Sequence, residues 1–205
     1  MTGGVPKLVL ATRNPAKLEE LSRILADGRV PVDLITAGHF PDLPEVAETG
    51  STFAENALLK ARAVAAFTGL PAVADDSGLC IDALNGMPGV LSARWSGAHG
   101  DDEANLRLVL GQLADVPDGR RGAHFACAAA LALPSGSEHV TEGVLDGRVI
   151  DAPRGTNGFG YDPIFVPESS DLTTAEMAPA DKDKISHRGR ALRALAPVIA
   201  ALLGS

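Results

Sequence analysis

Apolar and polar residues alternate with two different periods along this chain, and together these periods predict strands mixed with helices. Apolar runs of strand length occupy residues 7–12, 30–36, 71–75, 123–133 and 140–150. Residues 134–137, Pro-Ser-Gly-Ser, separate the last two runs, and this turn sequence predicts a β-hairpin.

Segments with helical spacing of apolar residues follow residue types that commonly cap a helix. These segments follow Asn14, Thr52, Asp101 or Asp102, and Ser186. Thr52 and Glu55 form the sequence of a capping box, and Gly69 predicts the end of that helix near residue 67. Pro197 is placed to kink the last helix, which we expect to reach residue 203. Strands, helices and a hairpin predict an α/β fold, in which helices flank a mixed, twisted β-sheet that has a ligand cleft.

Composition narrows the classes of function. The 205 residues carry a formal net charge of −8, whereas nucleic acids and anionic membranes attract positive surfaces. Residues 1–7 lack the apolar stretch of a signal peptide, and no apolar run is long enough to cross a membrane. Cys80 and Cys127 lie in apolar surroundings without metal-binding spacing, which indicates buried thiols in a reducing compartment. We therefore expect a cytoplasmic protein that binds neither nucleic acid nor membrane.

The first candidate site is the strand-to-helix junction at residues 12–17, Thr-Arg-Asn-Pro-Ala-Lys. The N-terminus of a helix presents unpaired N–H groups and a partial positive charge, so it attracts anions such as phosphate. Lys17 falls in the first turn, where its charge opposes the helix dipole until a phosphate binds. Without a ligand we therefore expect Lys17 to add nothing to stability. The alternative is a solvated surface lysine after an ordinary cap.

The second candidate is Asp75-Asp76-Ser77-Gly78, at the predicted end of a strand. Successive side chains of a strand point to opposite sides, so only one of the two carboxylates faces a given pocket. A carboxylate at a strand end is able to hold Mg²⁺ and to take a proton from water, and Ser77 is able to donate to a phosphate oxygen. The alternative interpretation is a polar turn.

Two further segments gather aromatic and basic residues. Residues 155–163 form a glycine-rich loop, in which Phe159 either stacks on a planar base or fills the core. Lys182 and the basic run at residues 187–190 place cations around the start of the last helix, where the dipole disfavours them. A basic surface turn is the alternative, but the same misfit already occurs at Lys17, and independent accidents rarely repeat one pattern.

Taken in order, these segments resemble the inosine triphosphate pyrophosphatase family, enzymes that remove non-canonical purine nucleotides. The matching motifs cover nearly the whole chain: Thr12-x-Asn14-x-x-Lys17, Glu48-Thr49-Gly50, Phe53-x-Glu55-Asn56-Ala57, Ala74-Asp75-Asp76-Ser77-Gly78-Leu79, Ser92-Ala93-Arg94, Gly158-Phe159-Gly160-Tyr161-Asp162-Pro163 and Ser186-His187-Arg188-Gly189-x-Ala191-Leu192. Each motif alone is weak, whereas the ordered set is specific. Leu91 departs from the pattern, because relatives often carry an aromatic residue there.

The resemblance implies one two-lobed domain over residues 1–205, with the substrate cleft between its lobes, and a homodimer. It implies Mg²⁺-dependent hydrolysis of nucleoside triphosphates such as ITP, dITP and XTP to the monophosphate and pyrophosphate. It implies that Asp76 is the general base and that Glu48 and Asp76 bind the metal. The implied substrate-binding residues are Thr12, Arg13, Asn14, Pro15, Ala16, Lys17, Ser77, Phe159, Gly160, Tyr161, Asp162, Lys182, His187 and Arg188.

Other functions remain open from the residues alone. A pyrophosphatase for other nucleotides, such as modified pyrimidines, is a rival enzyme. A nucleotide-binding sensor without turnover is less favoured, since added carboxylates weaken the binding of a polyanion unless a metal is used. A nucleic-acid-binding module is disfavoured by the net charge of −8.

Overall fold

The computed structural model describes residues 5–12 and 14–203, and its strands form a mixed sheet of seven strands. The strands are β1 (Lys7–Leu10), β2 (Asp33–Thr36), β3 (Ala72–Ile81), β4 (Met87–Pro88), β5 (Gly122–Ala132), β6 (Glu138–Val149) and β7 (Phe165–Pro167). Their order is β2-β1-β3-β5-β6-β7, and β4 pairs with β3 outside this row. β1 pairs in parallel with β2 and β3, whereas the β3–β4 and β6–β7 pairs are antiparallel.

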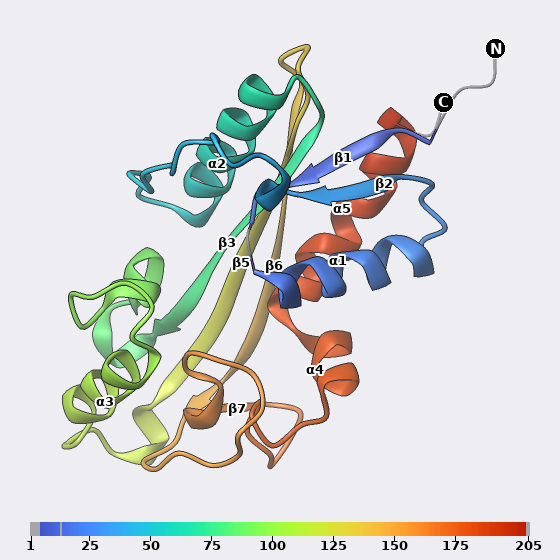
Figure 1. The fold of residues 1–205 in the computed structure, drawn as a ribbon. Helices are drawn as coiled ribbons and strands as arrows, with labels where there is room; N and C mark the ends of the chain where they lie inside the picture. The colour runs from blue at the N-terminus through green and yellow to red at the C-terminus, as the bar shows by residue number, and fades with distance from the viewer. Residues whose placement is uncertain (1–4, 13, 204–205) are drawn as a thin grey trace. The chain divides into compact units, whose positions relative to one another are not determined.

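Helices flank this sheet, as Figure 1 shows. They are α1 (Pro15–Asp27), α2 (Phe53–Thr68), α3 (Asp102–Gln112), α4 (Pro179–Ile185) and α5 (His187–Leu203). The prediction of an α/β fold with a mixed sheet and flanking helices is therefore confirmed. The chain divides into two compact units: a first unit of Met1–Asp76, Cys127–Gly143 and Arg188–Ser205, and a second unit of Ser77–Ala126 and Val144–His187. One two-lobed domain with a cleft between the lobes stays a prediction.

In the first unit helices cover both faces of the sheet. Successive residues of a strand point to opposite sides, so the residues of β1 contribute to two apolar clusters. Leu8 and Leu10 of β1 pack in one apolar cluster with residues of α1 and α5. Val9 of the same strand packs in another cluster with Ala57 and Ala61 of α2. Figure 1 shows α1 and α5 on one side of β1 and α2 on the other.

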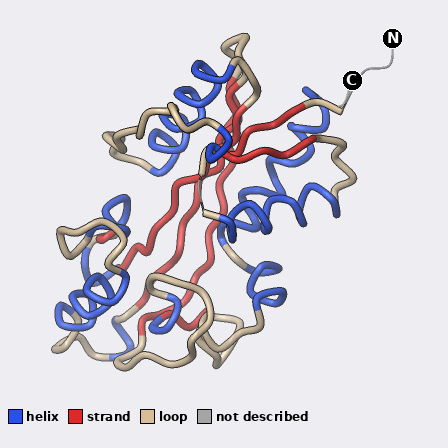
Figure 2. The backbone as a smooth tube through the Cα atoms, in the orientation of Figure 1, coloured by secondary structure: helices blue, strands red, loops and turns tan. Residues whose placement is uncertain are grey.

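The second unit has a core of its own. Leu79 and Ile81 of β3 are fully buried there, together with Val109 of α3. The rings of Phe125 and Phe165 add an aromatic contact, with centroids 4.6 Å apart. Most of the chain between β6 and β7, and between β7 and α4, is loop and turn (Figure 2).

The structure confirms the predicted helix starts. α1 begins at Pro15, and α3 follows Asp101, whose side chain accepts from the N–H of Ala104. Thr52 and Glu55 form the capping box of α2, which ends at Gly69 in the left-handed conformation with φ of 68°. The predicted β5–β6 hairpin is present as well. Elements that were not predicted from the sequence are α4 and the short strands β4 and β7.

The predicted end of β3 is wrong. This strand was expected to stop at Asp75, but it continues to Ile81. The reason is tertiary packing: Leu79 and Ile81 are both 0% exposed in the core of the second unit, and Cys80 pairs with Pro88. Asp75 and Asp76 therefore lie inside a strand, and the alternative of a polar turn is also excluded.

Two expectations from composition concern cysteines and membranes. Cys80 and Cys127 are free and buried, as predicted. Burial raises the pKa of both thiols, so they stay protonated and unreactive. Within the described part of the chain no helix has the length and apolar character needed to cross a membrane.

Candidate active site

Two adjacent aspartates of β3, Asp75 and Asp76, place one carboxylate on each face of the sheet. Asp75 shares a face with Val73, which packs in the cluster of α1 and α5, and Asp76 shares a face with Ala74, which packs in the cluster of α2. Both residues are buried, with 6% and 8% of their surfaces exposed. The prediction that the two carboxylates point to opposite sides is confirmed, and each has its own partners.

Asp75 joins two cations at a single oxygen. Lys17 Nζ of α1 lies 2.8 Å from Asp75 Oδ2, and Arg188 Nε of α5 lies 3.0 Å from the same atom. Arg188 Nη1 also lies 3.8 Å from Glu20 Oε2. Burial acts to raise the pKa of Asp75, but the charges of Lys17 and Arg188 outweigh it and hold this pKa well below its ordinary value. Asp75 is thus a buried anion that fixes two cations.

This ion pair corrects the expectation for Lys17. Asp75 neutralises the charge of Lys17 in the protein itself. No bound phosphate is needed to balance this charge against the helix dipole. The ammonium is only partly exposed, with 21% of the side-chain surface accessible. The partner was hidden from sequence patterns since 58 residues separate the two positions. Lys17 therefore has a partner for its charge without a ligand.

Asp76 shares a lysine with Glu48, and this lysine was not predicted. Lys60 Nζ lies 2.7 Å from Glu48 Oε1 and 3.0 Å from Asp76 Oδ1. Asn56 Nδ2 donates to the other oxygen, Asp76 Oδ2, at 3.1 Å. Burial raises the pKa of Asp76, and the nearby charge of Glu48 adds to this rise while Lys60 opposes it. A raised pKa suits a carboxylate that takes a proton from water.

The oxygens of Glu48 and Asp76 fit a small divalent cation. One ammonium already contacts both carboxylates, so a single cation is able to reach them together. Burial acts to lower the pKa of Lys60, but the charges of Asp76 and Glu48 raise it, so this ammonium stays charged. Mg²⁺ prefers such oxygens and keeps several waters, so one or two carboxylates suffice. Among the described residues no cluster of three or more His, Cys, Asp or Glu side chains forms an all-protein metal cage.

In the second unit, Asp162 organises the glycine-rich loop from inside. Its Oδ2 accepts from Phe159 N at 2.9 Å and from Lys182 Nζ, and its Oδ1 accepts from Thr174 Oγ1 at 2.8 Å. Gly158 makes room for this carboxylate, because a Cβ there would lie 2.1 Å from Asp162 Oδ2. Lys182 Nζ also lies 5.5 Å from the centre of the Phe159 ring. Asp162 therefore holds an aromatic ring and a cation next to each other.

The aromatic residues of this unit have distinct positions. Phe159 is 49% exposed, which excludes the interpretation that it fills the core. Tyr161 takes that place instead: it is buried, and its hydroxyl donates to the carbonyl of Ser92 at 2.9 Å. His187 is also buried, and its ring stacks on Phe125 with centroids 4.8 Å apart.

The remaining predicted residues lie in ordinary local structure. Asn14 N donates to Thr12 Oγ1 at 3.1 Å, just before α1. Ser77 is partly exposed in β3. Gly160 N donates to Asp102 Oδ2 at 2.8 Å, at the start of α3. Arg13 and the side chains of Pro15 and Ala16 were predicted as well, but they lie outside the residues that the structure describes.

Comparison with known proteins gives the family. A sequence model of the Ham1 family matches residues 8–198. This chain belongs to the Ham1 family.

The dITP/XTP pyrophosphatase of Streptomyces coelicolor is 63% identical over 198 residues, which cover 97% of this chain and 99% of that protein. The dITP/XTP pyrophosphatase of Mycobacterium bovis is 55% identical over 199 residues, which cover 97% of each chain. The solved structure of a HAM1 protein from Coxiella burnetii has a TM-score of 0.87 and 44% identity, over 95% of this chain and 98% of that one. The predicted resemblance is confirmed.

Asn56 and Lys60 of this Ham1-family chain were not predicted as site residues, although α2 carries a signal for both. Ala57, Ala61 and Val64 mark the buried side of the helix. Asn56 and Lys60 lie one turn apart along that side. A polar residue beside a buried apolar stripe requires a polar partner, so the pattern indicates a buried contact. It does not identify Asp76 as that contact.

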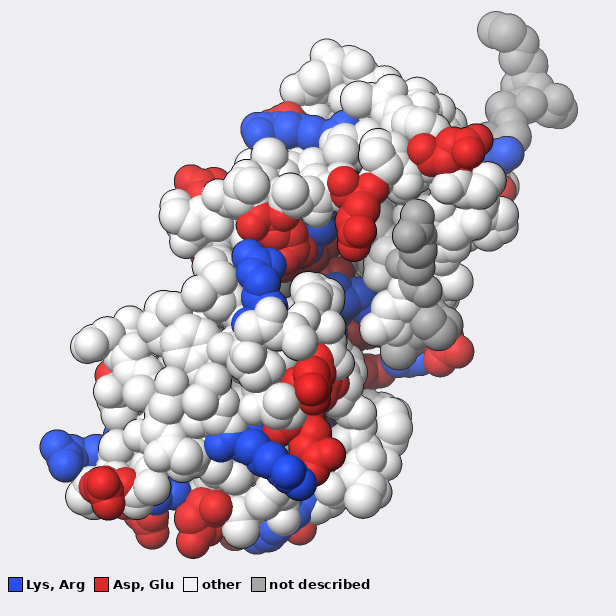
Figure 3. Space-filling view, turned by 60° about the vertical axis from the view of Figure 1, so that its left-hand side comes forward, with Lys and Arg blue, Asp and Glu red and all other residues white. Residues whose placement is uncertain are grey.

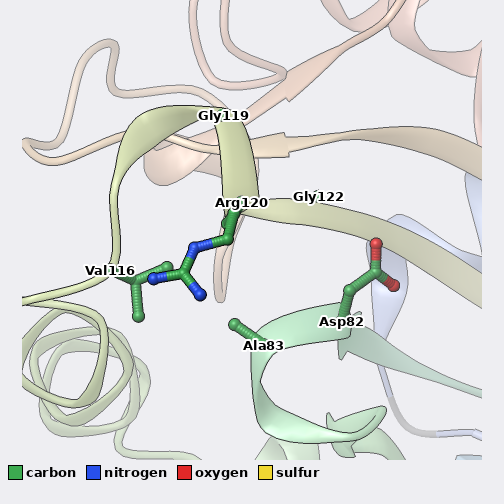
Figure 4. Close-up of a pocket in the computed structure, with 6 residues that line it drawn as sticks. All are labelled: Asp82, Ala83, Val116, Gly119, Arg120 and Gly122. Carbon is green, nitrogen blue, oxygen red and sulfur yellow. The ribbon is translucent and has the colours of Figure 1, made fainter.

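Two surface features of this chain lie outside the predicted site: a hollow in the second unit and the distribution of charged side chains. A hollow of about 460 Å³ in the second unit is lined by Asp82, Ala83, Val116, Gly119, Arg120 and Gly122, as Figure 4 shows. It contains none of the predicted site residues, and we assign it no part in the reaction. On the face drawn in Figure 3, basic and acidic side chains are interspersed.

Proposed function

We propose that this chain hydrolyses ITP, dITP and XTP to the monophosphate and pyrophosphate, with Mg²⁺ held by Glu48 and Asp76. The observation that carries the proposal is the pair of carboxylates that meet at one cation, Lys60. The substrate class is supported by relatives named dITP/XTP pyrophosphatases, which are 53% to 63% identical over nearly the full chain.

Charge balance supports the need for a metal. Three cations of the first unit, Lys17, Lys60 and Arg188, already contact four carboxylates. These carboxylates are Glu20, Glu48, Asp75 and Asp76. A triphosphate that approaches this group meets no surplus of positive charge, so binding requires an added cation. This balance also disfavours a sensor that binds nucleotide without a metal.

The residues of the first unit then divide the work on the phosphates. Asp76 holds a water molecule and accepts its proton while the water oxygen attacks the α-phosphorus and pyrophosphate leaves. Lys17, Arg188 and the N-terminus of α1, with Thr12 to Lys17, bind the phosphate oxygens. Bound Mg²⁺ supplies neutralising charge and acidifies its water. Ser77 donates to a phosphate oxygen.

The residues of the second unit select the base. Phe159 stacks on the purine and adds affinity for every base. Donors near His187 bond to a 6-keto oxygen, whereas the 6-amino group of adenine leaves them unpaired at roughly 1–3 kcal/mol each. We assign Tyr161 and Asp162 a supporting part, because their side-chain oxygens already bond within the chain.

We also propose a homodimer that acts in the cytoplasm. The family resemblance supports the dimer, and the proposed activity on the free nucleotide pool supports the location.

Pyrophosphate release from a panel of nucleotides tests the function. The panel contains dITP, XTP, ITP, GTP, ATP and a modified pyrimidine triphosphate, each with Mg²⁺ and with a chelator. We expect the highest kcat/KM for dITP, ITP and XTP, and no turnover with the chelator. Equal values for ITP and ATP would end the proposed base selection, and a preference for the modified pyrimidine would favour the rival enzyme. Release from none of them would overturn the reaction itself.

A further inference from the structure

Asn56 of α2 is an asparagine without any exposed surface, and the other buried residues of this helix are apolar. Ala57 and Ala61 beside it are fully buried as well. Burial of an amide is unfavourable unless its donor and acceptor both find partners. The contacts of Asn56 therefore explain why an amide stands at this position.

Each end of the Asn56 amide bonds to a different part of the candidate active site. Its Oδ1 accepts from Gly50 N at 2.8 Å, in the loop that follows Glu48. Its Nδ2 donates to Asp76 Oδ2 at 3.1 Å. Gly50 allows this approach, because a Cβ there would lie 2.7 Å from Asn56 Oδ1. One rigid, planar group thus joins the Glu48 loop to Asp76.

The two oxygens of Asp76 are divided between two positions of the same helix. Asn56 bonds to Oδ2, while Lys60, one turn further along α2, contacts Oδ1 at 3.0 Å and Glu48 at 2.7 Å. A neutral amide has no charge to exchange with a metal, whereas an ammonium competes with one. Asn56 therefore fixes which oxygen of Asp76 remains on the side of Glu48.

We propose that Asn56 is a positioning residue, which orients the Asp76 carboxylate and anchors the Glu48 loop so that both carboxylates meet one Mg²⁺. The inference rests on the proposed function. Groups that orient metal ligands commonly change metal affinity or activity by roughly 10–100-fold when they are removed. Asn56 touches neither the phosphorus nor the water in this scheme, and it acts through Asp76.

The chain offers a matched control in Asn105 of α3. Both asparagines stand four residues after the cap of their helix, at Thr52 and at Asp101. Asn105 is 1% exposed, and its Oδ1 accepts from a loop N–H, that of Ser96, at 2.7 Å. Its Nδ2 has no hydrogen-bond partner among the described residues. Asn105→Ala therefore repeats the loss of a buried loop contact without touching Asp76.

The experiment compares wild type, Asn56→Ala and Asn105→Ala. Mg²⁺ alone is titrated into each protein by calorimetry, and kcat and KM for dITP are measured at saturating Mg²⁺. We expect Asn56→Ala to weaken Mg²⁺ binding by roughly 10–100-fold and to lower kcat over a similar range. We expect KM to change by less than about threefold, since the phosphate and base contacts stay in place. Asn105→Ala should keep wild-type metal affinity and kcat.

Asn56→Asp keeps the inference testable if the alanine variant does not fold. The new carboxylate still accepts from Gly50 N but repels Asp76, so we expect kcat to fall at least tenfold. Wild-type kcat in this variant, or an Asn56→Ala protein that matches Asn105→Ala in Mg²⁺ affinity and kcat, would overturn the positioning role. A wild-type protein that releases no pyrophosphate from dITP would instead overturn the proposed function, so the two failures are distinguishable.

Discussion

Replacement of Asp75 by asparagine tests whether the buried anion holds Lys17 and Arg188. The change keeps the shape of the side chain but removes its charge. Both cations then remain in place without the negative charge that they share. Asp75 has only 4% of its side-chain surface exposed, so water cannot replace the lost carboxylate easily.

The size of the effect follows from the two contacts. At 2.8 Å and 3.0 Å, each attraction is about 6 kcal/mol with an effective dielectric constant of about 20. Desolvation of the three ions offsets most of this gain in the wild type. The variant loses the attraction but keeps the desolvation of the cations, so we expect a loss of about 3–5 kcal/mol in the free energy of unfolding. For a chain of this size that corresponds to a Tm lower by roughly 6–20 °C.

The pH dependence gives an independent readout. The pKa of Asp75 is lowered in the folded protein, so its stabilising effect is complete above the ordinary pKa of about 3.9 and is lost as pH falls through the folded-state value. The difference in stability between wild type and Asp75→Asn should therefore be constant from about pH 5 to 7 and shrink below about pH 4. Calorimetric or circular-dichroism melts across this range measure it.

Asp118→Asn is the matched control for loss of a carboxylate. Asp118 lies 3.7 Å from Arg121, but its side chain is 95% exposed. Exposed pairs contribute about 0–1 kcal/mol, so this variant should melt close to wild type. An Asp75→Asn protein that melts within about 2 °C of wild type at pH 7 would refute the reasoning, because a buried pair should cost several times more.

The other predictions concern the site and the assembly. Lys17→Ala should lower the Tm of the ligand-free protein, which reverses the sequence-based expectation; an unchanged Tm would restore it. Asp76→Asn should lose at least ~10²-fold in kcat while its circular-dichroism spectrum stays native, and near-wild-type turnover would remove Asp76 as general base. Phe159→Ala should raise KM for ITP and GTP alike without a change in Tm, and a Tm drop would indicate a core residue. Sedimentation equilibrium should give twice the 21.1 kDa of one chain, whereas a mass of one chain contradicts the dimer.

Local interactions made the helices predictable. The cap residues Asn14, Thr52, Asp101 and Ser186 place the starts of α1, α2, α3 and α5, because a cap bonds only to residues of the next turn. The end of β3 was not predictable in this way. Asp-Asp-Ser-Gly has the composition of a turn, and only burial of Leu79 and Ile81 in a core formed by distant segments keeps it extended.

The family resemblance predicts a set of site residues, but it does not predict the contacts between them. The family motifs contain Lys17, Asp76 and Arg188, yet nothing local shows that Asp75 is the residue that ties Lys17 to Arg188. These contacts span 58 and 113 positions along the chain. The roles proposed for Asp75 and Asn56 depend on contacts between residues far apart in the sequence, so only the folded structure reveals them.

The carboxylate of Asp162 occupies the space that a side chain at Gly158 would need. Any Cβ at residue 158 would collide with this carboxylate, and the loop would lose the bonds to Phe159 and Lys182 that keep it ordered. A loop that is already ordered adds little conformational entropy cost when a ligand arrives, so association can approach the rate of diffusional encounter. A change at only one of the two residues would remove that order. We therefore expect residues 158 and 162 to be inherited as a pair.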